Sequence, residues 1–285
     1  MFVIMGASGH VGREVINVLL EQGQEVIAVT HDPKHVDGLQ RPGVHPALAD
    51  VTHPDSLRQV FKQGRRAFLL NPPAAVDGDT DAVERRTAAC ILEALRETRL
   101  EKVVLASTGG ARPGERLGDL NVLWELEEGV RALQIPAAIN RGGYYMSNWD
   151  GQLDEVRRSG TLVSFFPGGM RVPMVAPRDL GGAAARRLLS GPDDTGVAYV
   201  EGPARYAPSD VAAAFASALR REVELAVVPR AQWASTFRSL GFSEAAAEAY
   251  ARMTEVTVDS LDLPDDPIRG KVTIDAYIRE LVGRR

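Results

Sequence analysis

Cysteine is almost absent from this chain of 285 residues, where Cys90 is the single one. A lone cysteine excludes an intrachain disulfide, favours a reducing compartment, and is expected here as a buried helix residue. Apolar runs of about 18 residues, long enough to cross a membrane, are missing too, and no signal peptide is recognisable. We therefore expect a cytoplasmic protein with no membrane partner.

A surplus of basic charge is also lacking, because the formal net charge is −5. That balance argues against a nucleic-acid partner, which normally needs a basic face. The five histidines all lie between His10 and His53, and His31 and His35 have helical spacing. No cysteine or clustered carboxylate joins them, so we predict a solvated turn there and no metal.

The first half of the chain alternates short apolar strands with amphipathic helices, a pattern typical of crossover units and a parallel sheet. The sequence predicts strands over residues 1–6, 24–30, 43–50, 66–73, 102–110 and 136–143, and helices over 10–23, 54–63, 81–99 and 120–133. We predict an α/β fold: a Rossmann-type doubly wound parallel sheet with a smaller, mainly helical C-terminal substrate lobe.

The predicted domains follow this change of character. Residues 1–150 form the Rossmann domain, and residues 171–202 return to its sheet. Residues 203–285 form the smaller lobe, to which residues 151–170 contribute. We expect the ligand in the cleft between the two.

Three glycines at intervals of three follow the first strand, in the stretch "MGASGHVGRE". Such a turn exposes backbone N–H groups at a helix N-terminus, where the helix dipole favours an anion. Gly6 can make the tight turn, Gly9 lets a pyrophosphate approach the backbone, and Gly12 lets the helix pack closely on the strand. The alternative is a strand–turn–helix joint without a ligand. The surrounding strand–helix–strand context favours dinucleotide binding.

The tip of the second strand bears on the choice between NADP and NAD. An acidic residue there binds the ribose of NAD, whereas a basic one pairs with the 2′-phosphate of NADP. The chain has His31, Asp32 and then Lys34. Asp32 precedes a proline and is equally well suited to a turn or cap. We predict NADP, bound by Lys34 with help from His31, and NAD as the alternative.

The ordered motifs "GASGHVG", "HDPKH", "ADVTHPDSL", "AFLLNPP", "VVLASTGGA", "INRGGYYMSN", "PMVAPRDLGGAAARRL" and "RGKVTIDAYIREL" span nearly the whole chain. Together they resemble the NmrA-like family of atypical short-chain dehydrogenase/reductases. That family includes NAD(P)H-dependent quinone reductases and redox-sensing regulators. Two departures concern His31, which stands where the family often has arginine, and Gly142, where relatives often have proline.

The resemblance implies where the cofactor lies. Asp50 and Val51 flank the adenine, the loop after the fourth strand runs along the cofactor towards the nicotinamide, and the fifth strand ends near the nicotinamide ribose. Local backbone roles are the alternatives for the polar residues of these segments. The predicted cofactor-binding residues are Gly6, Ser8, Gly9, His10, Val11, Gly12, His31, Lys34, Asp50, Val51, Asn71, Pro72, Pro73, Ser107 and Thr108.

The Tyr-x-x-x-Lys pair of many short-chain dehydrogenases is missing, because no lysine stands four residues after any of the six tyrosines. In that pair the lysine lowers the tyrosine pKa, and the tyrosine exchanges a proton with the substrate oxygen. The helix over 120–133 has no lysine either, and Leu123 lies near the place where some relatives carry one. A quinone suits such an enzyme, since its reduction yields a stabilised hydroquinone anion that water can protonate.

The stretch "RGGYYMSNW" is the candidate substrate edge. We predict catalytic or substrate-contacting roles for Tyr144, Tyr145 and Asn148, with the two tyrosines and Trp149 stacking on a flat ring. The alternative is that these aromatics pack the lobe interface. Arg141 is expected to face a structural carboxylate rather than a phosphate.

Two functions from different classes fit the sequence. The leading one is NAD(P)H-dependent reduction of a quinone-like or other activated unsaturated small molecule. The rival is a non-catalytic NAD(P)-binding redox sensor that passes its state to a regulatory protein partner. A homodimer is compatible with both.

Overall fold

The computed structural model describes residues 1–261 and 263–284, so residues 262 and 285 of the predicted lobe lie outside the described part. Its main sheet has eight strands in the order β13-β10-β6-β5-β4-β1-β2-β3, and every neighbouring pair is parallel. The predicted parallel sheet is thereby confirmed. Its strands are β1 (Phe2–Ile4), β2 (Val26–Thr30), β3 (Val44–Leu48), β4 (Arg66–Leu69), β5 (Lys102–Thr108), β6 (Ala137–Gly142), β10 (Gly196–Glu201) and β13 (Ile268–Arg269).

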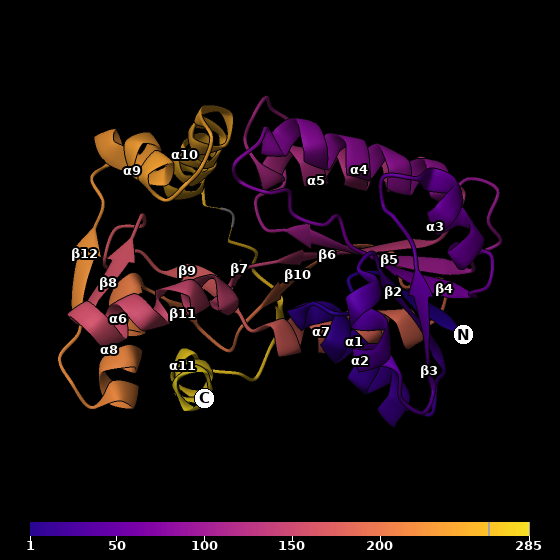
Figure 1. Cartoon of the computed structure of the whole chain (residues 1–285), viewed down its shortest axis with the longest axis horizontal. Coiled ribbons are helices and arrows are strands. Elements are labelled where there is room, and N and C mark those ends of the chain that lie inside the picture. The colour runs from indigo at the N-terminus through magenta and orange to yellow at the C-terminus, as the bar shows by residue number, and fades with distance from the viewer. Residues whose placement is uncertain (262, 285) are drawn as a thin grey trace.

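Helices cover both faces of the sheet, as Figure 1 shows. One layer holds α3 (Pro54–Phe61), α4 (Thr80–Leu95) and α5 (Asp119–Arg131). The opposite layer holds α1 (His10–Glu21), α2 (Val36–Leu39) and α7 (Pro177–Leu189). The sheet is therefore doubly wound, and the strand order reverses between β1 and β4. Ligands of such sheets bind at this reversal, outside the carboxyl ends of the strands.

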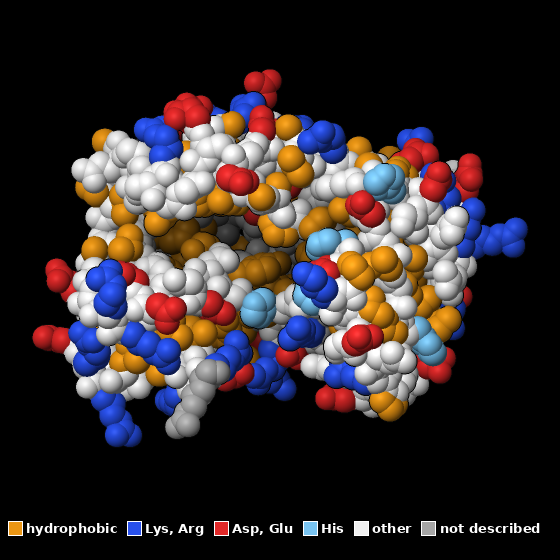
Figure 2. Space-filling view, in the orientation of Figure 1, with side chains coloured by type: hydrophobic (Ala, Val, Ile, Leu, Met, Phe, Trp, Pro, Cys, Tyr) orange, Lys and Arg blue, Asp and Glu red, His pale blue; other side chains and the backbone are white. Residues whose placement is uncertain are grey.

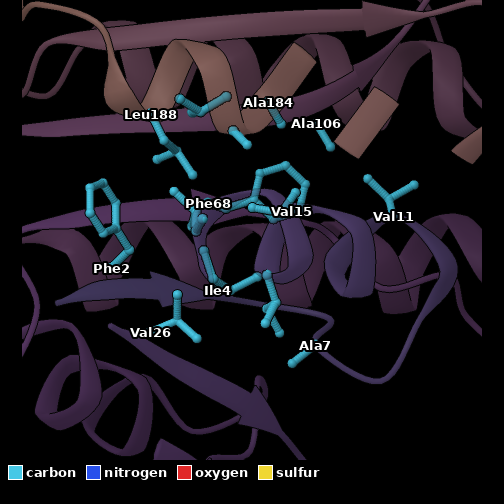
Figure 3. Close-up of a cluster of buried hydrophobic side chains, with 14 of the residues drawn as sticks. Phe2, Ile4, Ala7, Val11, Val15, Val26, Phe68, Ala106, Ala184 and Leu188 are labelled. Carbon is cyan, nitrogen blue, oxygen red and sulfur yellow. The ribbon is translucent and has the colours of Figure 1, made fainter. Parts of the chain in front are cut away.

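Alternation along β1 divides the core into two layers. Phe2 and Ile4 point to the layer of α1 and α7, where they pack with Val15, Phe68 and Leu188 (Figure 3). Their neighbours along the strand point to the layer of α3, α4 and α5. Each such side chain contributes roughly 1.5–3 kcal/mol when fully buried. The first strand and first helix are thus held rigidly, which fixes the loop between them.

A second group of elements forms the smaller lobe. A three-stranded sheet of β7 (Tyr144–Tyr145), β9 (Val172–Val175) and β11 (Arg205–Tyr206) lies beside a pair of β8 (Thr161–Ser164) and β12 (Glu224–Val227). The lobe's helices are α6 (Leu153–Ser159), α8 (Pro208–Leu219), α9 (Trp233–Ser239), α10 (Glu244–Asp259) and α11 (Ile274–Gly283). Short 3-10 turns complete the chain: η1 (Pro33–His35), η2 (Met146–Gln152) and η3 (Arg230–Gln232).

Strands from the C-terminal half of the chain pair in both the main sheet and the smaller lobe. Within residues 171–202, β10 pairs with β6 in the main sheet, whereas β9 pairs with β7 and β11. From the predicted lobe, β13 adds an edge strand to the main sheet. A boundary at residue 150 stays a prediction.

Three expectations need correction or comment. Cys90 is half-buried rather than buried, because it lies on the outer flank of α4, where its Sγ contacts the Thr52 carbonyl oxygen at 3.6 Å. Within the described residues, no helix combines the length and apolar character that crossing a membrane requires. Over residues 1–261 and 263–284, no three histidine, cysteine or acidic side chains gather as a metal site.

Candidate functional site

The three glycines of the β1–α1 loop have three different geometric roles. Gly6 has a φ of +63°, which favours glycine, and its carbonyl oxygen accepts the Gly9 N–H at 2.9 Å. A Cβ on Gly12 would come within 2.2 Å of that same oxygen, so only glycine lets α1 pack this closely. A Cβ on Gly9 would meet only the Gly6 oxygen, at 3.3 Å. Gly9 therefore leaves open space directly above the loop.

The N-terminus of α1 is well suited to an anion. Its N-cap is Gly9, and among the described residues no side chain caps it and no acidic residue lies in its first turn. His10 is exposed at this end, while Ser8 is half-buried and Val11 is buried. The first N–H groups of a helix need outside acceptors, and the dipole favours a negative one. This loop fits a dinucleotide pyrophosphate.

At the tip of β2, the side chain of Asp32 is occupied by the backbone. Its Oδ1 accepts the Lys34 N–H at 2.9 Å and caps η1, so the capping role considered for Asp32 is confirmed. His31 and Lys34 are both exposed beside it. The basic side chains are thus free to turn towards a ligand, whereas the acidic one is held.

The ends of β3 and β4 are fixed by short-range hydrogen bonds. Asp50 accepts the N–H and the hydroxyl of Thr52 at 2.8 and 2.7 Å, and these bonds lower the pKa of its carboxyl. Val51 packs half-buried on the core. Beyond β4, Asn71 donates to the Glu84 carbonyl oxygen at 3.1 Å and accepts the Thr87 hydroxyl at 2.7 Å. The loop of Asn71 is therefore tied to the first turns of α4.

The ends of β5 and β6 share one buried carboxylate. Glu127 accepts the Ser107 hydroxyl at 2.5 Å and two bonds from the Arg141 guanidinium, at 2.9 and 2.8 Å. These bonds raise the pKa of Arg141 above its ordinary value. Arg141 has the structural role that its position predicts. The Ser107 hydroxyl serves Glu127, while Thr108, the next residue, is half-buried at the strand end.

The aromatic side chains of the predicted substrate edge pack against other parts of the protein. Tyr144 lies edge-on to Trp149 and Phe166, with ring centroids 5.7 and 5.2 Å away, and bonds to the exposed Asn148. Trp149 is 2% exposed, so its predicted stacking on a substrate is wrong, because the ring is buried in the core of the lobe. Tyr145 is half-buried, and it packs against the core layer of α1 and α7.

Gly142 makes room for the ring of Tyr145. A Cβ at Gly142 would approach the Tyr145 Cε1 to 3.1 Å and the Leu180 Cδ2 to 2.9 Å. Burial raises the pKa of Tyr145 to about 12, and the nearby Asp119 adds to the shift. Its hydroxyl therefore stays protonated at neutral pH.

A hollow opens between α9 and α10 on one side and the β7–β9 layer on the other, with hydrophobic side chains inside it (Figures 1 and 2). One hydrophobic cluster of the smaller lobe contains Phe165, Phe237, Phe242 and Tyr250. Phe165 and Phe237 stack at 4.2 Å, and Tyr250 of α10 lies edge-on to Phe242 at 5.0 Å. The hydrophobic side chains inside the hollow are of the kind that line small-molecule sites.

Residues 6–133 match the NAD(P)H-binding protein family. This part of the chain is an NAD(P)H-binding domain. The chain is also 25% identical to an NAD(P)H azoreductase of Xenophilus azovorans over 251 residues, which cover 87% of this chain and 84% of that protein.

Two solved structures share the fold over nearly their whole length. An NADPH-dependent quinone oxidoreductase from Escherichia coli, solved with NADPH, has a TM-score of 0.79 at 18% identity and covers 99% of both chains. NmrA, a negative transcriptional regulator, has a TM-score of 0.70 at 20% identity, covering 98% of this chain and 94% of NmrA. The predicted resemblance to the NmrA-like family is confirmed at the level of fold.

Within the NAD(P)H-binding domain, Lys34→Ala is expected to reduce the preference for NADP over NAD. Lys34 is exposed, so its contact with a 2′-phosphate contributes about 1 kcal/mol, or roughly fivefold in the ratio of dissociation constants. Calorimetric titration with both nucleotides measures the ratio. Lys62→Ala, an exposed lysine at the end of α3, is the matched control. An unchanged ratio in Lys34→Ala would make this lysine a surface charge only.

Sequence reasoning missed two carboxyl groups of this domain. Glu84 is 3% exposed on α4, and burial together with the charge of Asp119, at the start of α5, raises the pKa of its carboxyl to about 7. The signal was present in part, because Glu84 falls at helical spacing with the buried Ala88, Ile91 and Leu95. An acidic residue within an apolar stripe needs a partner. Nothing in the sequence indicates that the partner lies on another helix.

Proposed function

We propose that this protein is an NAD(P)H-dependent oxidoreductase that reduces a quinone-like or other activated unsaturated small molecule by hydride transfer, without a Tyr-x-x-x-Lys pair. The observation that carries the proposal is the position of the hydrophobic hollow, between α9 and α10 and the layer of β7 and β9, where β7 holds Tyr144 and Tyr145 (Figures 1 and 2). The likenesses to an azoreductase and to a quinone oxidoreductase support it.

In this proposal each part of the site has a separate role. The loop around Gly9 and the N-terminus of α1 hold the pyrophosphate, and the loop at Asn71 directs the cofactor along α4 towards the hollow. When bound, the nicotinamide supplies the hydride. The ring of Tyr145 orients a flat acceptor, and the aromatic wall excludes water. Proximity and orientation alone can supply several kcal/mol to such a reaction.

The lack of a tyrosine–lysine pair favours an activated acceptor over a simple ketone. Burial raises the pKa of Tyr145, one of our two candidate tyrosines, to about 12, far above neutrality. It is therefore a poor acid for a developing alkoxide. A hydroquinone anion is much more stable than an alkoxide, so its formation needs no comparably strong acid.

A sensor without turnover is the second candidate function, favoured by the shared fold with the regulator NmrA. In this case the bound dinucleotide sets the conformation seen by a regulatory protein, in the cytoplasm, with or without a homodimer. The two candidates differ in one property, which is consumption of the reduced cofactor.

Steady-state oxidation of NADPH tests the proposal with a panel of small quinones, an azo compound and an unactivated ketone. We expect turnover with the quinones and none with the ketone. Confirmed NADPH binding without oxidation by any acceptor would support the sensor instead.

Tyr145→Phe is expected to keep most of the quinone reductase activity, whereas Tyr145→Ala loses about tenfold, because stacking of the ring is worth roughly 0.5–1.5 kcal/mol. Steady-state kinetics measure both variants, and thermal melting checks that the alanine variant is folded. Tyr144→Phe, which alters a packed ring, is the control. A loss with phenylalanine as large as with alanine would show that the hydroxyl is needed.

A further inference from the structure

The connection between β4 and α4, residues 70–79, begins beside the glycine loop. Leu70 packs against Gly6, where an added Cβ would collide with the Leu70 Cδ2. The two loops lead to opposite faces of the sheet, because β1 continues into α1 and β4 into α4 (Figure 1). A ligand held at such a reversal of strand order lies between the loops on its two sides. This β4–α4 segment therefore forms the second side of the predicted cofactor crevice.

The middle of the β4–α4 segment has little conformational freedom. The Asn71 side chain donates to the Glu84 carbonyl oxygen at 3.1 Å, and the Ala74 N–H donates to the Glu84 carboxyl at 2.9 Å. Between these two bonds lie Pro72 and Pro73, whose rings fix φ at about −65°. Few torsions of this stretch are free. We therefore expect the segment to order and open as one unit.

The far end of the segment is bonded to the first turn of α10. Ser243 donates its backbone N–H to the Val76 carbonyl oxygen at 2.9 Å and its hydroxyl to the Gly78 carbonyl oxygen at 2.7 Å. The same hydroxyl accepts the Ala246 N–H at 3.1 Å and so caps the helix. A hydroxyl can do both, because it has one hydrogen to donate and lone pairs to accept. Ser243 thus joins the β4–α4 segment to α10.

Neighbouring contacts hold α10 in the same place. The Arg116 guanidinium pairs with Asp79, the N-cap of α4, at 3.1 Å, and the Arg116 carbonyl oxygen accepts the Arg252 Nε–H of α10 at 3.0 Å. On its other side α10 packs on α9, where the rings of Tyr250 and Phe237 lie edge-on at 5.7 Å. These two helices border the hollow (Figures 1 and 2). The bonds of the β4–α4 segment therefore reach from the cofactor crevice to one side of the hollow.

We propose that Ser243 is a positioning residue that couples the cofactor crevice to the hollow, and the use of the hollow as the acceptor site rests on the proposed function. A dinucleotide in the crevice stabilises the ordered β4–α4 segment. Through Ser243, the segment then holds the first turn of α10 in place, so an acceptor finds its site already ordered. Linkage makes the effect reciprocal: a bound acceptor tightens dinucleotide binding by the same factor.

Three substitutions separate the coupling from the helix cap. Ser243→Asp keeps an oxygen that accepts the Ala246 N–H, but its carboxylate has no hydrogen for the Gly78 carbonyl oxygen and repels it. Ser243→Thr keeps both bonds. Thr273→Asp is the matched control, because Thr273 caps α11 in the same lobe by accepting the Ala276 N–H at 3.2 Å. Thermal melting checks that all three variants are folded.

The first measurement is amide hydrogen exchange with and without NADPH, which needs no acceptor. In wild type, saturating NADPH should slow exchange by at least about tenfold both in the β4–α4 segment and in the first turn of α10. The bonded N–H groups of Ala246 and Ala247 report on that turn. In Ser243→Asp the segment should stay protected, whereas the first turn of α10 should lose most of its protection. Ser243→Thr and Thr273→Asp should behave as wild type.

The second measurement is the dissociation constant of NADP⁺ with and without saturating menadione, a small quinone. Both molecules are oxidised, so no electrons pass between them and binding is measured alone. Menadione should tighten NADP⁺ binding by at least about fivefold in wild type, Ser243→Thr and Thr273→Asp. In Ser243→Asp the change should be less than about twofold, because the two sites are then uncoupled.

The outcomes distinguish the coupling from the proposed function. If NADPH leaves exchange in α10 unchanged in wild type, or slows it equally in Ser243→Asp, the coupling is overturned, and quinone turnover by wild type would still support the proposed function. Equal tightening by menadione in wild type and Ser243→Asp would also overturn the coupling. Protection of α10 that depends on Ser243, without quinone turnover or any effect of menadione, would overturn the proposed function while the link from crevice to α10 stands.

Discussion

Gly9→Val is expected to weaken NADPH binding by at least about tenfold while leaving the fold intact. A Cβ added at Gly9 would meet only the Gly6 carbonyl oxygen, at 3.3 Å, so the protein itself has room for a small side chain. A branched side chain would fill the space above the loop, where the pyrophosphate reaches the first N–H groups of α1. Overpacking of this kind costs roughly 1–3 kcal/mol, here in the complex alone.

Calorimetry with NADPH and thermal melting without it measure the two sides of this prediction. Gly9→Ala should give a smaller loss of affinity, since it adds only the Cβ. Gly151→Val, where a Cβ would meet nothing within 4 Å, is the control for adding a branched residue. Equal affinity in Gly9→Val and wild type would mean that the dinucleotide does not approach this loop.

Gly12→Ala is expected to destabilise the fold, whereas Gly9→Val is expected to weaken ligand binding. Its Cβ would lie 2.2 Å from the Gly6 oxygen and 2.7 Å from the Gly6 carbonyl carbon, and backbone atoms cannot rotate away. The cost of the clash, about 3 kcal/mol or more, outweighs the gain of roughly 1 kcal/mol from replacing a helical glycine. We expect the melting temperature to fall by about 4–8 °C.

Gly182→Ala in α7 is the matched helical control for Gly12→Ala. A Cβ there would come no closer than 3.4 Å, and only to the flexible end of Arg186, so the helix-propensity gain should prevail. Without ligand, the melting temperature should therefore fall in Gly12→Ala and rise in Gly182→Ala, each relative to wild type. A Gly12→Ala variant as stable as wild type would show that α1 can shift on the sheet.

The elements that the sequence predicted well are those governed by local pattern. The alternation of Phe2 and Ile4 with their neighbours marks a strand buried on both faces, and Val11, Val15 and Leu19 mark the inner face of α1. The glycine loop joins two such elements, so its geometry follows from them. The match of residues 6–133 to the NAD(P)H-binding family agrees with the dinucleotide predicted for this loop.

The features that the sequence did not reveal depend on contacts between distant segments. Trp149 follows a glycine-rich edge and looks available for stacking, yet the lobe core encloses it. Ile268 and Arg269 are too short a strand to show a period, and only pairing with β10 makes them one. Glu84 and Asp119 are 35 positions apart by their numbers, on different helices, so the effect of one carboxyl on the pKa of the other has no local signal.

The central claim is hydride transfer from the bound nicotinamide to a quinone, and anaerobic single-turnover mixing tests it most directly. Protein loaded with NADPH is mixed with one equivalent of a small quinone, and both products are quantified. The account predicts one hydroquinone per NADPH consumed, with a primary isotope effect when the transferred hydrogen of the nicotinamide is deuterium. NADPH that stays bound and unoxidised in the presence of the quinone would contradict the account.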